Sequence, residues 1–557
     1  MTYPAKNETL DLQGLTIKAD DIILSGGNPI SFSRYKADST GVQDVTDRLV
    51  EAINEAASQH TTLVIPYGES GQYRIKKEHI VFSGLSSFAV HCEPGVTIVD
   101  EGRLVNRADS GTMRLPWGIE FNNCSDFSWT GGVFKITGSS LGGSSTGAFD
   151  ANNYEERNPL LWIVDSTKVR LKGIGHYGNP GRGITLFTGY PTDPAEVAAI
   201  ATRSAFFNAV GCTDIHREDS YLVGDTCSME QVTFANCEVV RWRGERSISA
   251  GNNFASLGKL IRVNKAFVGD FYVVDTGSGS LVDFIGNDIL YSDCRLIYPN
   301  GKAWDISHEW RGANSPCRNF RAVNINTTGR GPNNASGNST QEQVEQAPIT
   351  DYVIENCRYE IGREVFSTDY APIVQTVIDY TSINDYFINS CPFGRSFSYD
   401  GGTGVVRVIN PRMEWTLPAG SLAQQRRQAL TMGLVQWFNV NWLQNASLAG
   451  SNQGLASFAF GKDSDAPVGS KHVFYGGKVQ DASWSISANT IVELYGVELV
   501  DFAWTGSGTL IAHNCTLDGV PFNTVPTEYA DDSAAASGGV PVGGTYRTGS
   551  ALKIRVS

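Results

Sequence analysis

Three short stretches combine carboxylates with aromatic or basic side chains, and one of them is KAWDISHEWR at residues 302–311. We predict that Asp305 and Glu309 are catalytic, because carboxyl groups can accept or donate a proton at a hydroxyl group. Indole rings offer large apolar faces to a ligand. The residues predicted to bind substrate in this site are Trp304, His308, Trp310 and Arg311. The alternative places Trp304 and Ile306 in the core, with the charges on a solvated rim.

The second stretch, residues 214–225, reads DIHREDSYLVGD. Glu218 and Asp219 are predicted to be catalytic, and His216 is predicted to contact substrate. Titratable groups gathered in this way are typical of catalytic sites. The alternative is a polar strand face that Arg217 neutralises.

The third stretch, residues 241–246, reads RWRGER. Glu245 is the predicted catalytic carboxylate, and Trp242 and Arg243 are predicted to bind substrate, because arginine holds an anionic group with two parallel hydrogen bonds. Asp275 and Asp283, on either side of TGSGSLV, are weaker candidates.

The composition indicates a β-rich, turn-rich protein that must position these stretches on strand faces or loops. The chain has 557 residues, 59 of them glycine, only 18% are charged, and few stretches show helical apolar spacing. The net charge of −14 argues against a nucleic-acid partner, since such binding needs clustered Lys and Arg. An acidic surface is compatible with a neutral glycan.

The same sequence predicts no membrane insertion, metal or cofactor. No apolar run reaches membrane-spanning length, and the start at Met1 has neither the basic nor the apolar region of a signal peptide. The ten cysteines are spread widely without a CxxC pair, so we expect free, buried thiols. No histidine cluster has the spacing of a zinc site.

Residues 31–75 are predicted to form a helix that leads into the first strand. Asp44 can accept backbone N–H groups at the helix N-terminus, and Leu49 and Ile53 recur on one face. A β-branched run at 61–65 and a turn at 68–71 follow, and residues 1–30 form a short N-terminal segment.

From residue 80 onward the pattern is one of short apolar strands, which need neighbours stacked above and below. A small polar residue followed by cysteine recurs at strand edges. Because asparagine tolerates the left-handed conformation, this pair predicts a corner with an inward cysteine, although coincidence among common turn residues is the alternative. The pairs are Asn123-Cys124, Asn236-Cys237, Asp293-Cys294, Asn356-Cys357, Ser390-Cys391 and Asn514-Cys515.

Other stretches predict insertions, helices and a repeat. Composition indicates insertions at 138–158 and 329–346 and a short helix within 191–205. Residues 423–443 predict a second helix, although their aromatic density could instead mark a contact between subunits. YGGKVQDASW from Tyr475 aligns with YGVELVDFAW from Tyr495, a 20-residue period that suits a three-sided β coil, and a shorter copy follows from His513. Asp481 and Asp501 recur with this period and are predicted turn residues.

The segment FSRYKADSTGVQDVTD at 32–47, followed by a helix, LVIPYG and YRI, resembles the start of pectate-lyase-like right-handed parallel β-helix proteins. It is especially similar to bacteriophage tailspike and capsule or O-antigen depolymerase chains, and GVPVGGTYRTGSALKIRV at 539–556 resembles a C-terminal segment of phage virion proteins. The resemblance implies an all-β solenoid with an N-terminal capping helix and a small C-terminal β domain. We therefore predict an N-terminal segment (1–30), the helix and β-helix (31–412), a helical or irregular connection (413–470), trimerising β repeats (471–525) and a tail (526–557).

The resemblance also implies a homotrimeric tailspike, made in the bacterial cytoplasm, that binds and depolymerises capsule, exopolysaccharide or O-antigen at the host surface. The large N-terminal attachment domain of many tailspikes is absent, so we expect either a shortened chain or a spike that other phage tail proteins hold. The polygalacturonase signatures are broken, as at Gly175-His176-Tyr177, and no catalytic residue carries over by motif. Acidic candidates outnumber isolated basic ones, which favours an endo-glycosidase with paired carboxylates. The alternatives are a polysaccharide lyase and a non-catalytic receptor-binding spike.

Overall fold

The structure is a computed structural model that describes more than half of the chain. The described residues are 9–12, 15–18, 28–76, 79–100, 118–136, 161–177, 207–224, 232–249, 258–275, 280–298, 304–307, 317–329, 349–360, 364–366, 378–388, 391–393, 405–415, 428–429, 434–444, 457–460, 470–488, 490–524, 530–537, 545–548 and 551–554. They fall into two compact units, Met1–Arg311 and Gly312–Ser557, which are considered separately below. The predicted helix within 191–205 and the insertion at 138–158 lie outside the described residues, as does nearly all of 329–346.

The N-terminal region follows the sequence prediction closely. An antiparallel pair, β1 (Thr9–Leu12) and β2 (Leu15–Lys18), precedes β3 (Ile30–Ser31), a short 3-10 helix η2 (Phe32–Tyr35), β4 (Thr40–Asp44) and α1 (Thr46–Ser58). Asp44 Oδ1 accepts the Thr46 N–H at 3.0 Å, and Leu49 and Ile53 are buried on the apolar face of α1. This face packs against β5 (Thr62–Ile65) and β8 (Ser86–Cys92). The predicted helix and first strand are therefore confirmed.

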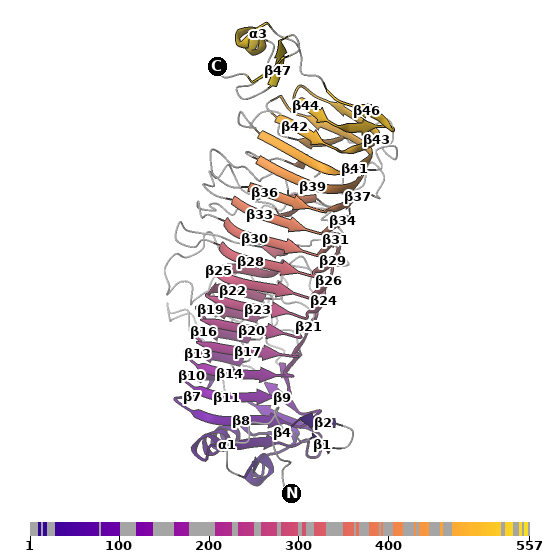
Figure 1. The fold of residues 1–557 in the computed structure, drawn as a ribbon. Helices are drawn as coiled ribbons and strands as arrows, with labels where there is room; N and C mark the ends of the chain where they lie inside the picture. The colour runs from indigo at the N-terminus through magenta and orange to yellow at the C-terminus, as the bar shows by residue number, and fades with distance from the viewer. Residues whose placement is uncertain are drawn as a thin grey trace, which may run out of the picture. The chain divides into compact units, whose positions relative to one another are not determined.

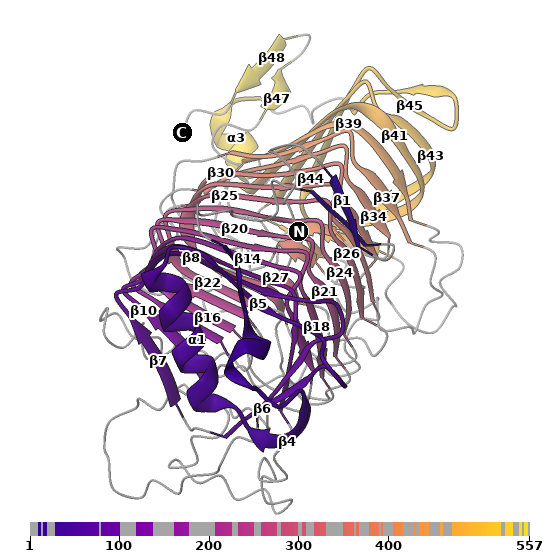
Figure 2. The ribbon, with the colours of Figure 1, turned by 90° about the horizontal axis from the view of Figure 1, so that it is seen from below.

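Unit 1 is a parallel β-helix in which three strands of each coil pair with the equivalent strands of the next coil (Figures 1 and 2). The first sheet contains β7 (His79–Ser83), β10 (Gly118–Asn122), β13 (Leu161–Val164), β16 (Phe207–Val210), β19 (Val232–Ala235), β22 (Gly258–Val263) and the start of β25 (Ser280–Ser292). The second sheet contains β5, β8, β11 (Ser125–Thr130), β14 (Thr167–Lys172), β17 (Asp214–Glu218), β20 (Val239–Arg243), β23 (Lys265–Gly269) and the end of β25. The third sheet contains β6 (Gln72–Ile75), β9 (Thr97–Asp100), β12 (Val133–Ile136), β15 (Gly175–Tyr177), β18 (Tyr221–Gly224), β21 (Arg246–Ser249), β24 (Tyr272–Asp275) and β26 (Arg295–Tyr298). The all-β parallel β-helix predicted from the sequence is confirmed.

A left-handed residue followed by a buried one forms a corner between two consecutive strands of a coil. In unit 1, Asn123, Asn236 and Asp293 have φ of 51°, 51° and 58°, and the cysteine after each is at most 2% exposed. Asn356 and Asn514 repeat the arrangement in unit 2, with φ of 55° and 52°. The predicted corner is thus confirmed for five pairs, whereas Ser390 of the sixth lies outside the described residues. The cysteines whose side chains are described are free and buried.

Stacked aromatic rings fill the interior of unit 1. Phe82 packs on Phe121 of the next coil with ring centroids 5.1 Å apart, and Phe88 packs on Phe127 at 5.3 Å. Parallel pairing in register places these rings directly above one another. Each fully buried phenylalanine stabilises the fold by about 1.5–3 kcal/mol, so the stack holds successive coils together.

Unit 2 also consists largely of parallel ladders. One ladder contains β28 (Cys317–Val323), β30 (Ile349–Glu355), β33 (Ile378–Ile383), β36 (Val405–Ile409), β39 (Leu434–Leu443), β41 (Ser470–Ile486), β42 (Thr490–Tyr495) and β44 (Thr509–His513). The other contains β29 (Asn326–Gly329), β31 (Arg358–Glu360), β34 (Tyr386–Ile388), β37 (Arg412–Glu414), parts of β39 and β41, β43 (Glu498–Thr505) and β45 (Cys515–Leu517). Shorter pairs are β32 (Glu364–Phe366) with β35 (Cys391–Phe393), β38 (Gln428–Ala429) with β40 (Ser457–Phe460), and β45 with β46 (Val520–Phe522). The chain ends with α3 (Asp532–Ser537) and the hairpin of β47 (Thr545–Thr548) and β48 (Ala551–Ile554).

The helix predicted within residues 423–443 is wrong. The described residues there form β38 and β39, and β39 pairs in parallel with β36 and β41. Val435 and Trp437 are buried two residues apart, Asn439 turns the chain with φ of 51°, and Val440 and Trp442 are buried two residues apart beyond it. The left-handed asparagine shifts the alternation of buried and outward side chains by one residue. The apolar residues of the two strand segments therefore recur together at a helical spacing. The described part of 413–470 is therefore not a helical connection.

The predicted 20-residue repeat corresponds to adjacent coils. Tyr475 pairs with Tyr495, and Trp484 pairs with Trp504. Asp481 and Asp501 have φ of 45° and 48°, so both are turn residues as predicted. Among the described residues, no helix is long and apolar enough to cross a membrane.

Candidate active site

A group of charged side chains lies on the outer face of the second sheet of unit 1. Parallel register places Arg170 of β14 beside His216 of β17, and His216 beside Arg241 of β20. Because side chains alternate between the two faces of a strand, Asp214 and Glu218 share the outer face with His216. Inward Ile215 and Arg217 separate these residues and are fully buried. Three coils thus bring five charged or titratable groups together.

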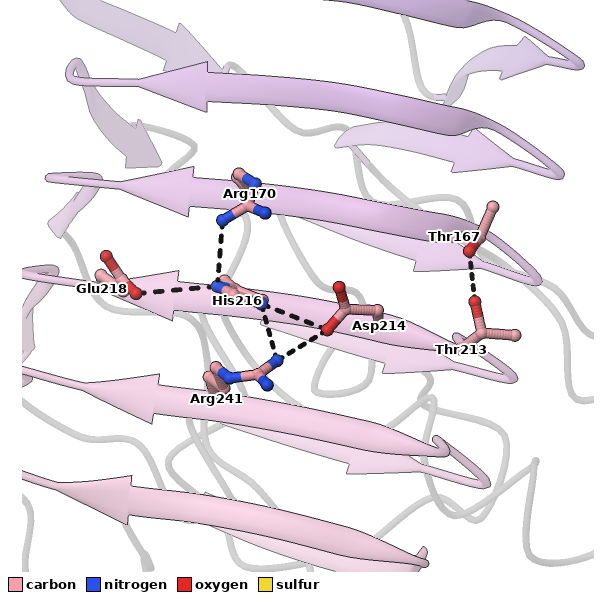
Figure 3. A network of polar contacts seen from close by, with 7 residues as sticks. All are labelled: Thr167, Arg170, Thr213, Asp214, His216, Glu218 and Arg241. Carbon is pink, nitrogen blue, oxygen red and sulfur yellow. Dashed lines mark hydrogen bonds and ion pairs between the residues drawn. The ribbon is translucent and has the colours of Figure 1, made fainter. Parts of the chain in front are cut away.

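The imidazole of His216 lies at the centre of this group, with Asp214 and Glu218 on either side and the arginines on the neighbouring coils (Figure 3). His216 Nε2 is 3.1 Å from Asp214 Oδ1, and His216 Nδ1 is 3.7 Å from Glu218 Oε1. Arg241 Nη1 is 2.9 Å from Asp214 Oδ1, and Arg170 Nη1 is 3.5 Å from His216 Nδ1. Two carboxylates and two guanidiniums therefore surround the ring.

The environment of His216 favours a neutral imidazole. Partial burial lowers its pKa below 6.5, as do Arg170 and Arg241, whereas Asp214 acts in the opposite direction. The His216 side chain is only 12% exposed. Arg241 Nη1 also lies 2.9 Å from His216 Nε2. The tautomer with its proton on Nε2 donates to Asp214 and leaves a lone pair on Nδ1, whereas the other tautomer accepts from Arg241 at Nε2. At neutral pH, this arrangement supplies a histidine that can accept a proton.

The surface around His216 carries several basic side chains, although the chain as a whole carries a net charge of −14. The acidic groups on this part of the surface include Asp214, Glu218 and Asp270, which pairs with Arg243 at 2.6 Å. Asp219 and Glu238 are also exposed, directly after β17 and directly before β20. These acidic groups lie among five basic side chains of the outer face: Arg170, Lys172, Arg241, Arg243 and Lys265. The guanidinium groups among these basic side chains can pair with an anionic ligand.

An aromatic ring continues the row of His216 and Arg241 onto the next coil. Phe267 of β23 pairs with Arg241 in the parallel register. The Arg241 guanidinium lies 5.4 Å from the centre of this ring, and Lys265 Nζ lies 5.3 Å from it. Such contacts hold the cations over the ring, so a flat apolar group adjoins the charged cluster.

The structure separates the residues predicted at 214–225. Glu218 and His216 lie in the cluster, and their catalytic and substrate-binding roles remain predictions. Asp219 instead occupies the corner after β17 with φ of 49°, and its backbone N–H donates to Arg243 O at 2.9 Å. We interpret Asp219 as a turn residue. Arg217 points inward and therefore does not neutralise the outer face.

The prediction for 241–246 is corrected at Trp242 and Glu245, because both lie in the interior with no exposed surface. Arg217 Nε and Nη2 donate to the two Glu245 oxygens at 3.0 and 3.1 Å, and Trp242 Nε1 donates at 2.8 Å. His176 Nε2 lies 3.4 Å from Arg217 Nη1. A polysaccharide cannot reach these groups, which form a buried polar network, whereas Arg243 is exposed.

The site predicted at 302–311 remains a prediction. Trp304 and Asp305 belong to β27 (Trp304–Ser307), which pairs in parallel with β25. The four remaining members of the predicted site lie outside the described residues: His308, Glu309, Trp310 and Arg311.

Sequence reasoning missed Asp214, Arg170 and Arg241 as members of one cluster. The signal was present in the spacing, because Arg170, His216 and Arg241 each follow a left-handed corner residue by five positions. These corner residues are Asp165, Gly211 and Asn236. Aligning the coils at their corners would have placed the three side chains in one row. In the described part of the chain, no group of three or more His, Cys, Asp or Glu residues could hold a metal ion.

The sequence matches no known protein family and no curated protein. Solved structures with a similar fold include an exopolygalacturonase from Thermotoga maritima (11% identity, TM-score 0.34, 89% of this chain and 93% of that one). The adhesin PfbA of Streptococcus pneumoniae (11%, 0.31, 95% and 100%) and the Dettilon tailspike protein (12%, 0.32, 80% and 66%) are also similar. At identities this low, the fold is assigned from the strand pairing described above, and function is inferred from the residues of the chain itself.

Proposed function

We propose that this chain binds and cleaves an acidic bacterial surface polysaccharide, with β-elimination at the His216 cluster as the reaction. The observation that carries the proposal is an imidazole kept neutral between two carboxylates and two guanidiniums on a solvent-facing strand. Elimination from a uronate needs a neutral base and positive charge beside the sugar carboxylate. Both requirements meet at this cluster.

Each member has a defined role in the proposed reaction. His216 Nδ1 takes the proton on the carbon next to the uronate carboxylate, and Asp214 holds the opposite ring nitrogen and stabilises the imidazolium. Arg170 and Arg241 neutralise the charge that develops on the uronate carboxylate. The electron pair of the broken C–H bond forms the new double bond, the glycosidic C–O bond breaks, and the leaving oxygen is protonated by solvent.

Hydrolysis is the second candidate, and it rests on the position of Asp214 and Glu218 on opposite sides of the ring. An inverting glycosidase needs two carboxyl groups roughly 6.5–9.5 Å apart with a water molecule between them. Here the imidazole occupies the space between the two carboxylates. For this reason elimination fits the described geometry better than hydrolysis does.

The proposal includes the biological setting that the sequence resemblance implies. The chain acts as a homotrimeric phage tailspike at the host cell surface, where its substrate is capsule, exopolysaccharide or O-antigen. The resemblance of residues 32–75 and 539–556 to tailspike and virion proteins supports this setting, together with the parallel β-helix.

The test incubates the purified chain with surface polysaccharides of bacteria that its phage infects. Elimination predicts new reducing ends together with the ultraviolet absorbance of an unsaturated uronate. Reducing ends without that absorbance would show hydrolysis and transfer the catalytic roles to Asp214 and Glu218. Binding without cleavage would show an adhesin and overturn the enzymatic proposal.

A further inference from the structure

Four side chains on the outer face of the third sheet form a single row across successive coils. Parallel register pairs Tyr221 of β18 with Arg246 of β21, Arg246 with Tyr272 of β24, and Tyr272 with Arg295 of β26. Figure 2 shows these four strands side by side. Neighbouring strands are about 4.8 Å apart, so the two tyrosines are separated by about 10 Å. We call these four residues the Tyr–Arg row.

The two tyrosines of the row are unusually exposed for large aromatic residues. Tyr221 is 36% exposed and Tyr272 is 37% exposed. The ring of Tyr221 extends over Gly175 of the preceding coil, where a Cβ atom would lie only 2.1 Å from the ring. Any larger residue at position 175 would push the ring away, so glycine makes room for this orientation.

Backbone oxygens and an aromatic ring contact the arginines of the row. Arg246 Nη1 donates to the backbone oxygens of Glu245 and Asp270 at 3.2 and 2.7 Å. The guanidinium of Arg295 lies 5.8 Å from the ring centre of Tyr272. Within the described part of the chain, neither arginine forms an ion pair with a carboxylate. Two positive charges thus remain available to a ligand on an otherwise acidic protein.

We infer that the Tyr–Arg row is a binding surface for an extended acidic polysaccharide, whose sugar rings contact the tyrosines while its carboxylates pair with the arginines. Aromatic rings provide apolar area for sugar faces, and guanidinium groups bind carboxylates through two hydrogen bonds. Only the Asp219-Ser220 corner separates Glu218 at the end of β17 from Tyr221 at the start of β18. The row therefore begins next to the His216 cluster and continues onto further coils.

This inference extends the proposed function by naming the surface that holds the substrate chain beyond the reacting sugar. Binding is measured without catalysis, so that the two proposals can fail separately. Affinity electrophoresis of the whole chain uses gels that contain alginate, polygalacturonate or, as the neutral probe, dextran. The variants are Tyr221→Ala, Tyr272→Ala and Arg295→Gln. Tyr475→Ala and Tyr495→Ala are matched controls, because their side chains are 39% and 37% exposed in unit 2.

The row predicts retardation of the wild-type chain in at least one acidic gel and not in the dextran gel. Each row variant is expected to weaken this binding roughly tenfold, as for an anchor residue at an interface, while the two controls bind like wild type. Circular dichroism establishes that each variant is folded. Failure of the wild type to bind either acidic polymer overturns the inference, as does equal loss in the row variants and the controls. Binding that survives in a protein without lyase activity would retain the row and reject the proposed reaction.

Discussion

The interior ion pair between Arg217 and Glu245 gives a stability prediction that the structure quantifies. Arg217 donates two hydrogen bonds to Glu245, at 3.0 and 3.1 Å, and neither side chain has any exposed surface. Arg217→Met keeps an unbranched side chain in the core but removes both bonds and the positive charge. The donor that still reaches the carboxylate is Trp242 Nε1 at 2.8 Å. Removing one partner of a buried pair costs about 3–5 kcal/mol, and we expect a loss of that size.

Arg243→Met is the matched control for this substitution. Arg243 lies on β20 and pairs with Asp270, but the two side chains are 52% and 45% exposed. An exposed ion pair contributes only about 0–1 kcal/mol, so this variant should remain close to wild type. The double variant Arg217→Met/Glu245→Gln removes the buried charge as well as its partner, and it should recover most of the lost stability.

The assay is urea unfolding of the intact chain, followed by tryptophan fluorescence. Two results would refute the reasoning. One is an Arg217→Met variant no less stable than Arg243→Met. The other is a double variant no more stable than Arg217→Met alone, because the cost would then not arise from the stranded carboxylate.

Three further predictions concern pH and the corners. Burial raises the pKa of Asp385 from 3.8 to about 7, so the folded chain binds this proton more tightly than the unfolded chain does. The free energy of unfolding should therefore fall as the pH rises between these two values, by on the order of 4 kcal/mol. Asp385→Asn should flatten that dependence in urea midpoints measured from about pH 4 to pH 8, and an unchanged slope would reject the assignment. Burial and the two arginines lower the pKa of His216 below 6.5. The proposed lyase activity should therefore persist below pH 6.5 and fall only at more acidic pH. A pH–rate profile with its acidic limb above pH 6.5 would contradict this. Asn236 has φ of 51°, so Asn236→Val should destabilise the fold by about 1–2 kcal/mol relative to Asn236→Gly in thermal unfolding, and equal stability of the two would show that the corner is not strained.

Local chemistry in the sequence predicted the architecture well. The helix at Thr46–Ser58 and the Asn-Cys corners depend on capping, apolar spacing and backbone preference, all of which act over a few residues. Residues 423–443 misled because the left-handed Asn439 interrupts the alternation of a strand. The buried residues alternate on each side of this corner, but the corner offsets the two alternations by one residue. Taken together, the apolar positions then recur at the spacing of a helix.

The candidate site was only partly predictable, because register across coils decides which side chains meet. His216 and Glu218 are near in sequence and were predicted together, whereas Arg170 reaches His216 only through the pairing of β14 with β17. Glu245 looked like an exposed carboxylate because RWRGER is polar, yet the corner turns its side chain into the core to meet Arg217. The direction of a corner side chain depends on the coil around it, and composition does not encode that direction.

The most direct test of the central claim compares the initial rate of unsaturated-uronate formation for wild type, His216→Ala and His513→Ala on a surface polysaccharide that the wild type cleaves. His513 belongs to β44 in unit 2, where it stacks on Tyr495 with ring centroids 4.7 Å apart, and it serves as the control histidine. A general base typically contributes a factor of about 10²–10⁴. Loss of at least about a hundredfold in His216→Ala, with His513→Ala near wild type, is the predicted result. A His216→Ala rate within a few-fold of wild type would contradict the assignment of the reaction to this cluster.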